Sequence, residues 1–438
     1  MAERLAADVV VVGAGPAGLA AAVHAAEAGA RVAVLDESPR AGGEVWRTGG
    51  PPAPPAAAWL GRLARAGGSL VAGASVVDAP APGELLLDRG GAALRVAWRR
   101  LVLATGAREL FLPFPGWTLP GVLGAGAAQA IAKAGASFAG MRVVVAGTGP
   151  LLLPVAASLR AGGATIVGIV EQAPLARLAL FGAGLAGRPG KLAEALGLGA
   201  RLAGVRYRAG SWARAAGGDG RVERVVVADG RRECEWACDV LACGFGLVAN
   251  LELPRLLGCA VAEDRVVVDG DQRTSCDGVF AAGELTAIGG LGHALATGAV
   301  AGLAAVGRPA PTRLLRERAR EEAFAARLAR AFALRPELGA LASSDTIVCR
   351  CEDVTLGAID GLAAEAAGRA AVAGGLDARA AKLHTRAGMG ACQGRVCGPA
   401  LGFLRGATGL TIRPPLVPAP LSVLADGAPG APVEEEQP

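Results

Sequence analysis

Two glycine-rich turns, each preceded by a β-branched run, constrain the fold of this chain more than any other feature. The first is GAGPAG, which begins at Gly13 and follows the run Asp8–Val12. The second is GTGPLL, which begins at Gly147 and follows MRVVVA. A strand, a tight glycine turn and a helix in this order form the βαβ unit that binds dinucleotides. The chain is therefore expected to be an α/β protein with two Rossmann-like units.

The first turn carries the complete dinucleotide fingerprint. Gly13, Gly15 and Gly18 have the G-x-G-x-x-G spacing, which allows the tight turn, the close approach of a pyrophosphate and the packing of the helix on the strand. The next strand, RVAVLDE, ends at Asp36, whose carboxylate suits a ribose hydroxyl and repels a 2′-phosphate. A glycine turn without a ligand is the competing interpretation, but the agreement of strand, spacing and acid favours a bound dinucleotide. The expected contacts are Gly13, Gly15, Pro16, Ala17, Gly18, Asp36, Glu37 and Gly43.

The second turn departs from this pattern at its third glycine. Gly147 and Gly149 are kept and Glu171 ends the following strand, but Leu152 replaces the third glycine. A bulky side chain there moves the helix away from the strand or blocks a dinucleotide, although the fold is expected to survive. Three interpretations stay open, namely an NAD(P)H site, an adenine nucleotide or other ligand held for structure, and an empty Rossmann unit. The expected contacts of any nucleotide are Gly147, Gly149 and Glu171, and Glu171 disfavours NADP.

Several motifs resemble the FAD-binding half of the two-dinucleotide-binding-domain flavoproteins. LVLATGARE, residues Leu101–Glu109, is similar to the ATG motif of that superfamily, and TSCDGVFAAGE, residues Thr274–Glu284, is similar to its final flavin motif. The resemblance implies that Thr105, Gly106, Gly283 and Glu284 contact FAD. Glu284 stands where aspartate is more usual.

The order of the motifs implies that the second Rossmann unit is inserted into the FAD domain. The chain is expected to leave that domain near Pro113–Val122 and to return near Asp239–Asn250. Pyridine nucleotide–disulfide reductases share this architecture, but their redox-active dithiol is absent here, since no cysteine occurs before Gly230. Five later cysteines are expected to be core or edge residues, namely Cys234, Cys238, Cys243, Cys259 and Cys276.

The other four cysteines form two pairs, Cys349-x-Cys351 and Cys392-x4-Cys397. Four thiolates suit zinc or an iron–sulfur cluster. Structural zinc usually takes C-x2–4-C pairs, so the C-x-C spacing favours [2Fe–2S], with zinc or vestigial cysteines as alternatives. A Rieske centre would need two histidine ligands, and the only imidazole nearby is His384, which is expected to be a surface or packing residue.

The neighbourhood of these cysteines suits an anionic cluster. Glycines 388, 390, 394 and 398 leave backbone N–H groups free to point at sulfur, and Arg350, Arg386 and Arg395 add positive charge. Both effects raise the potential of a cluster. This part of the chain resembles the bacterioferritin-associated ferredoxin-like [2Fe–2S] domain, a small helical module.

Composition excludes one class of partner and bears on the location. The net charge is only +5 and the basic residues are scattered, so no nucleic-acid partner is expected. No secretory signal precedes the first strand, which predicts a cytoplasmic protein, free or at the inner face of the membrane. The long uncharged segment 287–307 is rich in glycine and alanine, which favours a close-packed helix inside a domain over a membrane span.

The motifs together resemble the α subunit of heteromeric amino-acid dehydrogenases, a family that includes subunits of hydrogen cyanide synthase, opine oxidase, and proline or hydroxyproline dehydrogenases. The carrying motifs are GAGPAGLAAA, PGWTLPGV, AGTGPLLLPVA, AAGELTAIGG, CRCEDVT and GMGACQGRVCG. The resemblance implies an oxidoreductase subunit with FAD and [2Fe–2S] that relays electrons to a quinone or the respiratory chain. It also implies a flavin-containing, oxidase-like β subunit that oxidises the substrate, and leaves room for a small third subunit.

No catalytic residue is assigned, because no paired carboxylates, Ser/His/Asp set or base poised over a flavin is evident. Two other functions stay open, an NAD(P)H-dependent reductase of an iron–sulfur partner and a non-catalytic scaffold. The expected division is 1–112 with 239–310 as FAD domain, 113–238 as inserted domain, 311–344 as helical linker, 345–412 as [2Fe–2S] domain, and 413–438 as a tail with a disordered end.

Overall fold

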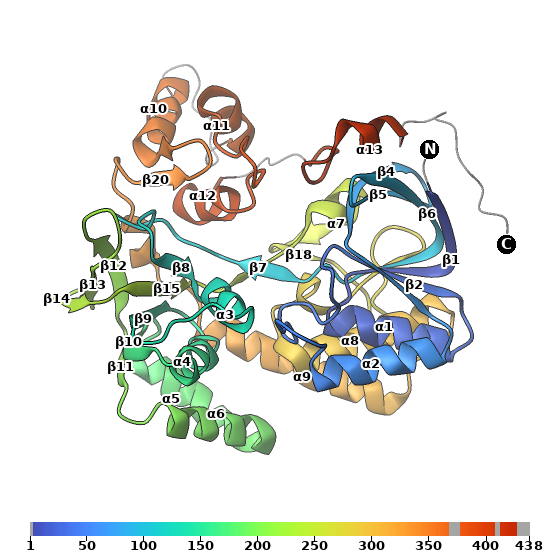
Figure 1. The fold of residues 1–438 in the computed structure, drawn as a ribbon, viewed down its shortest axis with the longest axis horizontal. Coiled ribbons are helices and arrows are strands. Elements are labelled where there is room, and N and C mark those ends of the chain that lie inside the picture. The colour runs from blue at the N-terminus through green and yellow to red at the C-terminus, as the bar shows by residue number, and fades with distance from the viewer. Residues whose placement is uncertain (1–2, 368–376, 408–411, 427–438) are drawn as a thin grey trace. The chain divides into compact units, whose positions relative to one another are not determined.

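A β-sheet lies at the centre of each of two units in the computed structural model, mixed in the first unit and parallel in the second (Figure 1). The structure describes residues 3–367, 377–407 and 412–426, so the end of the tail that was expected to be disordered, residues 427–438, lies outside the described residues. The first unit comprises the chain up to residue 108, residues 248–326 and the chain from residue 412. The second unit comprises residues 109–247 and 327–411.

The sheet of the first unit has the strand order β3-β2-β1-β6-β5-β4, and β19 pairs with β6. Strand β1 is parallel to β2 and β6, whereas β4, β5 and β6 form an antiparallel extension. The strands of this unit are β1 (Glu3–Val12), β2 (Val32–Asp36), β3 (Ser69–Ala72), β4 (Ala74–Ala81), β5 (Glu84–Arg89), β6 (Ala92–Leu103), β17 (Val261–Ala262), β18 (Arg265–Val266) and β19 (Val279–Ala281). Its helices are α1 (Pro16–Glu27), α2 (Pro54–Arg65), α7 (Glu252–Leu256), α8 (Gly290–Ala305) and α13 (Leu421–Asp426), with a 3-10 turn at Gly283–Leu285.

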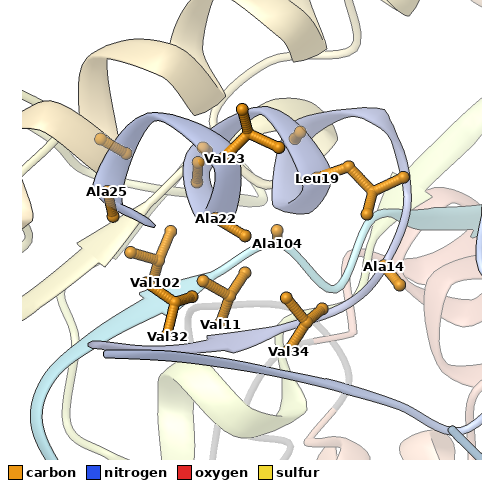
Figure 2. Close-up of a cluster of buried hydrophobic side chains, with 14 of the residues drawn as sticks. Val11, Ala14, Leu19, Ala22, Val23, Ala25, Val32, Val34, Val102 and Ala104 are labelled. Atoms are coloured by element: carbon orange, nitrogen blue, oxygen red, sulfur yellow. The ribbon is translucent and has the colours of Figure 1, made fainter. Parts of the chain in front are cut away.

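Helix α1 packs directly on this sheet (Figure 2). Leu19 and Ala22 point from the helix toward Val11, Val34 and Val102 of three neighbouring strands, and all five side chains are fully buried. Small and β-branched side chains at this layer let the helix approach the strands closely. The βαβ unit predicted at Gly13 is therefore present.

Helix α8 packs against α1 through glycines. A Cβ added at Gly298 would lie 2.9 Å from the carbonyl carbon of Ala17, and one at Gly302 would lie 2.8 Å from that of Ala21. This close approach explains why the segment 287–307 is so rich in glycine and alanine. The expectation of a packed helix is confirmed, and among the described residues no helix has the length and apolar character needed to cross a membrane.

The sheet of the second unit has the order β11-β10-β9-β15-β8, and all its pairings are parallel. Its strands are β8 (Val122–Gly124), β9 (Arg142–Gly147), β10 (Thr165–Glu171), β11 (Arg206–Ala209) and β15 (Val240–Gly244). A separate antiparallel sheet contains β12 (Trp212–Gly217), β13 (Arg224–Ala228) and β14 (Glu233–Ala237). The helices are α3 (Ala125–Lys133), α4 (Leu152–Ala161), α5 (Leu175–Ala183) and α6 (Pro189–Arg201), with a 3-10 turn at Gly184–Gly187 between the last two.

Three connecting elements span the boundaries between the units. Strands β7 (Ala107–Glu109) and β16 (Leu247–Ala249) pair with each other, and helix α9 (Thr312–Ala331) runs across residue 326. Most of α9 is solvent-exposed, as expected for a connecting helix, although Phe324 and Ala325 are buried.

The second unit also contains the cysteine region, which is mainly helical. A short hairpin of β20 (Ile347–Cys349) and β21 (Val354–Thr355) precedes α10 (Leu356–Ala367), α11 (Ala378–Thr385) and α12 (Cys397–Arg405), and a 3-10 turn at Pro336–Ala340 leads into it. Its core contains Val348, Ile359 and Leu401 together with two of the cysteines. Arg405 of α12 pairs with Asp360 of α10 through two contacts of 2.7 and 2.8 Å.

Candidate functional site

The first glycine turn lies at the carboxyl end of β1 and can be built only with glycine. Gly13 has φ +106°, and a Cβ there would lie 2.8 Å from the carbonyl carbon of Ala104. A Cβ at Gly18 would lie 2.9 Å from the carbonyl carbon of Gly13. Among the described residues no side chain caps the start of α1. Its first N–H groups are therefore available to a phosphate, which the helix dipole also attracts.

Segments that are distant in the sequence meet around this turn. Gly42 donates its backbone N–H to the carbonyl oxygen of Ala14 at 2.8 Å, and a Cβ at Gly43 would lie 3.0 Å from Cα of Gly15. On another side, a Cβ at Gly283 would lie 2.7 Å from Cβ of Ala17. The structure thus brings the final flavin-like motif and the loop containing Gly43 to the turn, as the resemblance to FAD-binding flavoproteins implied.

Asp36 lies at the end of β2 beside the turn and is half-buried. Its carboxylate accepts hydrogen bonds from the backbone N–H groups of Ala14 and Ser38. Burial raises the pKa of Asp36, while those two hydrogen bonds oppose the rise. Glu37, the next residue, is exposed. Asp36 is therefore the acid of this pair that lies at the turn.

Glu284 provides an unsatisfied acceptor in the final flavin-like motif. Its Oε1 accepts the backbone N–H of Gly290, near the start of α8, at 2.8 Å. Its Oε2 is buried and has no hydrogen-bond partner within the described ranges. Burial raises the pKa of Glu284 to about 7. A buried acceptor without a partner is costly, so this atom fits a ligand hydroxyl that would donate to it.

Two further residues were expected near this site on the basis of sequence. Thr105 exchanges hydrogen bonds with Asn250, its Oγ1 donating to the carbonyl oxygen at 3.0 Å and its carbonyl oxygen accepting Nδ2 at 2.8 Å. The carbonyl oxygen of Gly106 accepts the backbone N–H of Asn250 at 3.0 Å. The ATG-like segment therefore holds Asn250 through three hydrogen bonds, at the point where the chain returns to the first unit. The sequence did not indicate this role for Asn250.

The second glycine turn keeps its backbone geometry. Gly147 has φ +142°, and a Cβ there would lie 2.6 Å from the carbonyl carbon of Gly244. Leu152 begins α4 and is 1% exposed, with its side chain in the core of the sheet. The fold thus accommodates the missing third glycine, as expected.

The acid of the second turn is less accessible than Asp36. Glu171 is 1% exposed, and its two carboxylate oxygens accept the backbone N–H groups of Gly149 and Ala173, each at 2.8 Å. Burial raises the pKa of Glu171 to about 7 against these two hydrogen bonds. Both oxygens therefore have partners within the protein.

The two cysteine motifs meet in the second unit. The thiol of Cys397 lies beside that of Cys349, and the thiol of Cys351 lies beside that of Cys392. Cys349 and Cys397 are 1% and 2% exposed, whereas Cys392 is half-buried and Cys351 is exposed. A Cβ at Gly390 would overlap Cβ of Cys351, so the second motif approaches the first closely.

Backbone N–H groups point at these sulfur atoms. Gly388 donates its backbone N–H to Sγ of Cys349 at 3.5 Å. Burial alone would raise the pKa of the Cys392 thiol, but the N–H groups of Val396, Gly394 and Arg395 and the thiol of Cys351 outweigh burial and lower that pKa. N–H groups directed at sulfur stabilise the thiolate form, which is the form that binds metal.

The surrounding arginines are partly engaged elsewhere. Arg386 pairs with Glu352 at 2.7 Å, which joins the second motif to the first, and the guanidinium of Arg350 lies 6.0 Å from the ring centroid of Trp117. In the described part of the chain no group of three or more His, Cys, Asp or Glu side chains is arranged to hold a metal ion. Four thiols are nevertheless the type of ligand that an iron–sulfur cluster takes.

The other five cysteines are core or edge residues, as predicted. All nine cysteines are free thiols. Cys238, Cys243 and Cys259 are buried, and Cys234 and Cys276 are partly buried.

Comparisons with known proteins agree with this architecture. Residues 7–302 match the family model described as pyridine nucleotide-disulphide oxidoreductase. The chain is 34% identical to a subunit of opine oxidase from Rhizobium meliloti, over 96% of this chain and 98% of that protein. It is 33% identical to hydrogen cyanide synthase subunit HcnB of Pseudomonas aeruginosa, over 94% and 97%. The crystal structure of L-proline dehydrogenase from P. horikoshii has a similar fold, with a TM-score of 0.67 and 21% identity over 97% of this chain and 80% of that one.

Proposed function

Because the chain belongs to the pyridine nucleotide-disulphide oxidoreductase family, and to the group that contains these subunits of opine oxidase and hydrogen cyanide synthase, we propose that it is an electron-transfer subunit of a heteromeric dehydrogenase. It would bind FAD and a [2Fe–2S] cluster and serve the oxidation of an amino or imino acid of the proline, hydroxyproline, opine or glycine type. As a member of this family the chain is a flavin-dependent oxidoreductase.

One observation carries this proposal: two pairs of thiols, each with one member from either of two distant motifs, lie close in a chain that also has the flavin-type turn. Cys349 and Cys397 approach each other in the core, and Cys351 and Cys392 do so toward the surface. Four cysteine ligands are the usual ligand set of a [2Fe–2S] cluster, and cytoplasmic cysteines grouped in this way favour metal over a disulfide framework.

The residues of the first unit have separate tasks in holding FAD. The uncapped start of α1 after Gly15 would face the pyrophosphate, and Asp36 would accept a ribose hydroxyl. Oε2 of Glu284 would accept a hydrogen bond from a further hydroxyl of FAD, and this buried atom would then have a partner. FAD held by these residues would supply two-electron chemistry with one-electron release, which suits a partner cluster that takes one electron at a time.

The residues of the second unit would hold the cluster and set its properties. Cys349, Cys351, Cys392 and Cys397 supply four sulfur ligands. The N–H groups that point at Cys349 and Cys392 stabilise negative charge on sulfur, and such hydrogen bonds raise the potential of a cluster. We retain residues 345–412 as the [2Fe–2S] domain and residues 311–344 as its linker.

The relatives are named as subunits, which supports a partner for this chain. We propose that a flavin-containing, oxidase-like β subunit oxidises the substrate and that a quinone or the respiratory chain accepts the electrons. A small third subunit is compatible with this arrangement. We assign no catalytic residue to this chain.

Anaerobic purification of the chain would test the proposal. We expect about two irons and two acid-labile sulfides per FAD, and a rhombic EPR signal only after reduction with dithionite. The variant Cys392→Ser should lose the iron while it keeps the flavin. Cys234→Ser is the matched control, because Cys234 lies on β14, outside the flavin motifs and the four-cysteine motifs, and should leave both cofactors unchanged.

Three results would count against the proposal. Zinc, or no metal at all, would make the cysteine region a structural element. Purification without flavin absorbance would favour a scaffold. Rapid oxidation of an amino acid by this chain alone would contradict the proposed division of labour with a β subunit.

A further inference from the structure

A buried glutamine at the second glycine turn holds a segment of the chain that comes from far along the sequence. Gln172 follows Glu171 and has no exposed surface. Its Nε2 donates to the carbonyl oxygen of Ala333 at 3.2 Å, and its Oε1 accepts the backbone N–H of Arg335 at 3.2 Å. A buried amide must find such partners, because its burial without them is costly. Gln172 therefore recognises the backbone of this segment at two points.

The turn itself makes a third contact with the same segment. Thr148, between the two glycines of the turn, donates from Oγ1 to the carbonyl oxygen of Phe332 at 3.2 Å. The same Oγ1 accepts the second N–H of Gln172 Nε2 at 2.8 Å. Thr148 and Gln172 thus form one buried network around the backbone of residues 332–335, which we call the anchor segment.

Side chains of the anchor segment add to these backbone contacts. The ring of Phe332 meets that of Phe181 edge to face, with centroids 5.1 Å apart. The guanidinium of Arg335 lies 5.0 Å from the ring centroid of Trp212 and pairs with Glu337. Aromatic pairs and cation–π contacts of this kind are stabilising beyond the area that they bury. The anchor segment is therefore fixed to the second unit through both backbone and side chains.

These contacts occupy the edge of the sheet at which a Rossmann unit meets its nucleotide. The pyrophosphate normally meets the glycine turn, and the ribose meets the acid at the end of the second strand. Here Thr148 of the turn bonds the anchor segment. Glu171 is 1% exposed, whereas Asp36 at the first turn is only half-buried. Leu152 replaces the glycine that a dinucleotide requires.

We infer that the nucleotide edge of the second Rossmann unit binds the anchor segment Phe332–Arg335 in place of a nucleotide. The unit acts as an intramolecular anchor for the chain that leads from α9 into the cysteine region. This role accounts for Leu152 at the third position of the motif, because a turn that binds peptide does not need a third glycine. It also removes the hydride-donor site that an NAD(P)H-dependent reductase would use.

The test uses the complete chain and does not depend on the metal content. NADH, NADPH and ATP are titrated in turn into the wild-type protein saturated with FAD, so that the first glycine turn is filled, and binding is followed by calorimetry. We expect no saturable binding up to about 1 mM of each nucleotide. Hydrogen exchange should show that the backbone N–H of Arg335 is protected, because it donates to the buried Gln172.

Two glutamine variants make the second arm of the test. Gln172→Ala should increase the exchange rate at Arg335 by about tenfold or more, without changing exchange in α4. Gln129→Ala is the matched control, since Gln129 lies in the same unit and its Nε2 contacts only the carbonyl oxygen of Pro154 at 3.4 Å.

Either of two results would overturn the inference. Saturable binding of any of the three nucleotides to the wild-type chain would show that the edge is open to nucleotide. Unchanged exchange at Arg335 in a folded Gln172→Ala variant would show that Gln172 does not hold the segment. If Gln172→Ala fails to fold, the titration of the wild-type chain decides alone.

Discussion

The contact between α1 and α8 makes Gly298→Ala a sharp test of the packing beneath the FAD turn. Gly298 is buried in α8, and the new Cβ would lie 2.9 Å from the carbonyl carbon and 3.0 Å from Cα of Ala17. It would also overlap the carbonyl oxygen of Ala17. Backbone atoms cannot rotate away as a side chain can. The two helices must therefore separate.

The size of the effect follows from that separation. Ordinary carbon contacts are at about 3.5 Å, so the helices must move apart by roughly 0.5–1 Å, a gap that loses a quarter to a half of each contact's attraction. Overpacking costs about 1–3 kcal/mol, and the clash with rigid backbone atoms puts it here at about 2–3 kcal/mol. The higher helix propensity of alanine offsets about 1 kcal/mol of that cost. We expect a net loss of about 1–2 kcal/mol in the free energy of unfolding, or a fall of about 2–8 °C in the apparent midpoint.

Thermal unfolding and flavin content would measure the effect together. The flavin content should also fall, because Ala17 lies in the first turn of α1 beside the pyrophosphate site. Gly197→Ala is the matched control. It lies in helix α6, and nothing is within 4 Å of its added Cβ, so we expect a gain of about 0.5–1 kcal/mol. A Gly298→Ala variant as stable as the wild type, with full flavin, would refute the proposed packing.

Three other predictions follow from single contacts. Glu284→Gln should weaken FAD binding by about ten- to a hundredfold in a fluorescence titration, because an amide nitrogen at the position of Oε2 cannot accept a hydrogen bond from a hydroxyl. An unchanged affinity would contradict this role of Glu284. Burial raises the pKa of Glu171 to about 7 from its ordinary 4.5, which favours the protonated acid in the folded state. The contribution of Glu171 to the free energy of unfolding is therefore largest below pH 4.5 and is lost as pH rises through 7, by up to about 3 kcal/mol. In denaturant unfolding, the Glu171→Gln variant should lack this decrease in stability between pH 4.5 and 7. Trp117→Phe removes the hydrogen bond from Nε1 to the carbonyl oxygen of Ile347 at 2.6 Å, two residues before Cys349. A chelator should therefore remove iron from this variant faster than from the wild type, with iron measured relative to flavin. An equal rate would argue that Trp117 does not position Cys349.

The local elements of the two Rossmann units were predictable because their signals are local. Gly13 and Gly147 indicate turns that only glycine can form, and both turns occur where the sequence predicted them. Cys238, Cys243 and Cys259 were predicted to be core or edge residues, and all three are buried. The proximity of Cys349 to Cys397 was not predicted, since nothing in either motif indicates which of the four thiols lie closest.

Other features of the site depend on contacts between distant segments. Gln172 and the backbone of residues 332–335 carry no motif, and the segment around α9 was expected only to be a solvated connecting helix. Asn250 likewise meets Thr105 only after the chain returns to the first unit. A hydrogen bond between such segments leaves no periodic or compositional trace, so neither contact could be read from the chain.

The amino-acid sequence alone therefore determined the two βαβ units, the likeness to FAD-binding subunits and the four cysteines that suit a cluster. These depend on backbone conformation and on residue spacing, which are properties of short segments. Tertiary structure decided what fills the edge of the second unit and which oxygen of Glu284 is left for a ligand. Those outcomes depend on which buried polar groups find partners, and that is settled only when the folded chain brings distant donors and acceptors together.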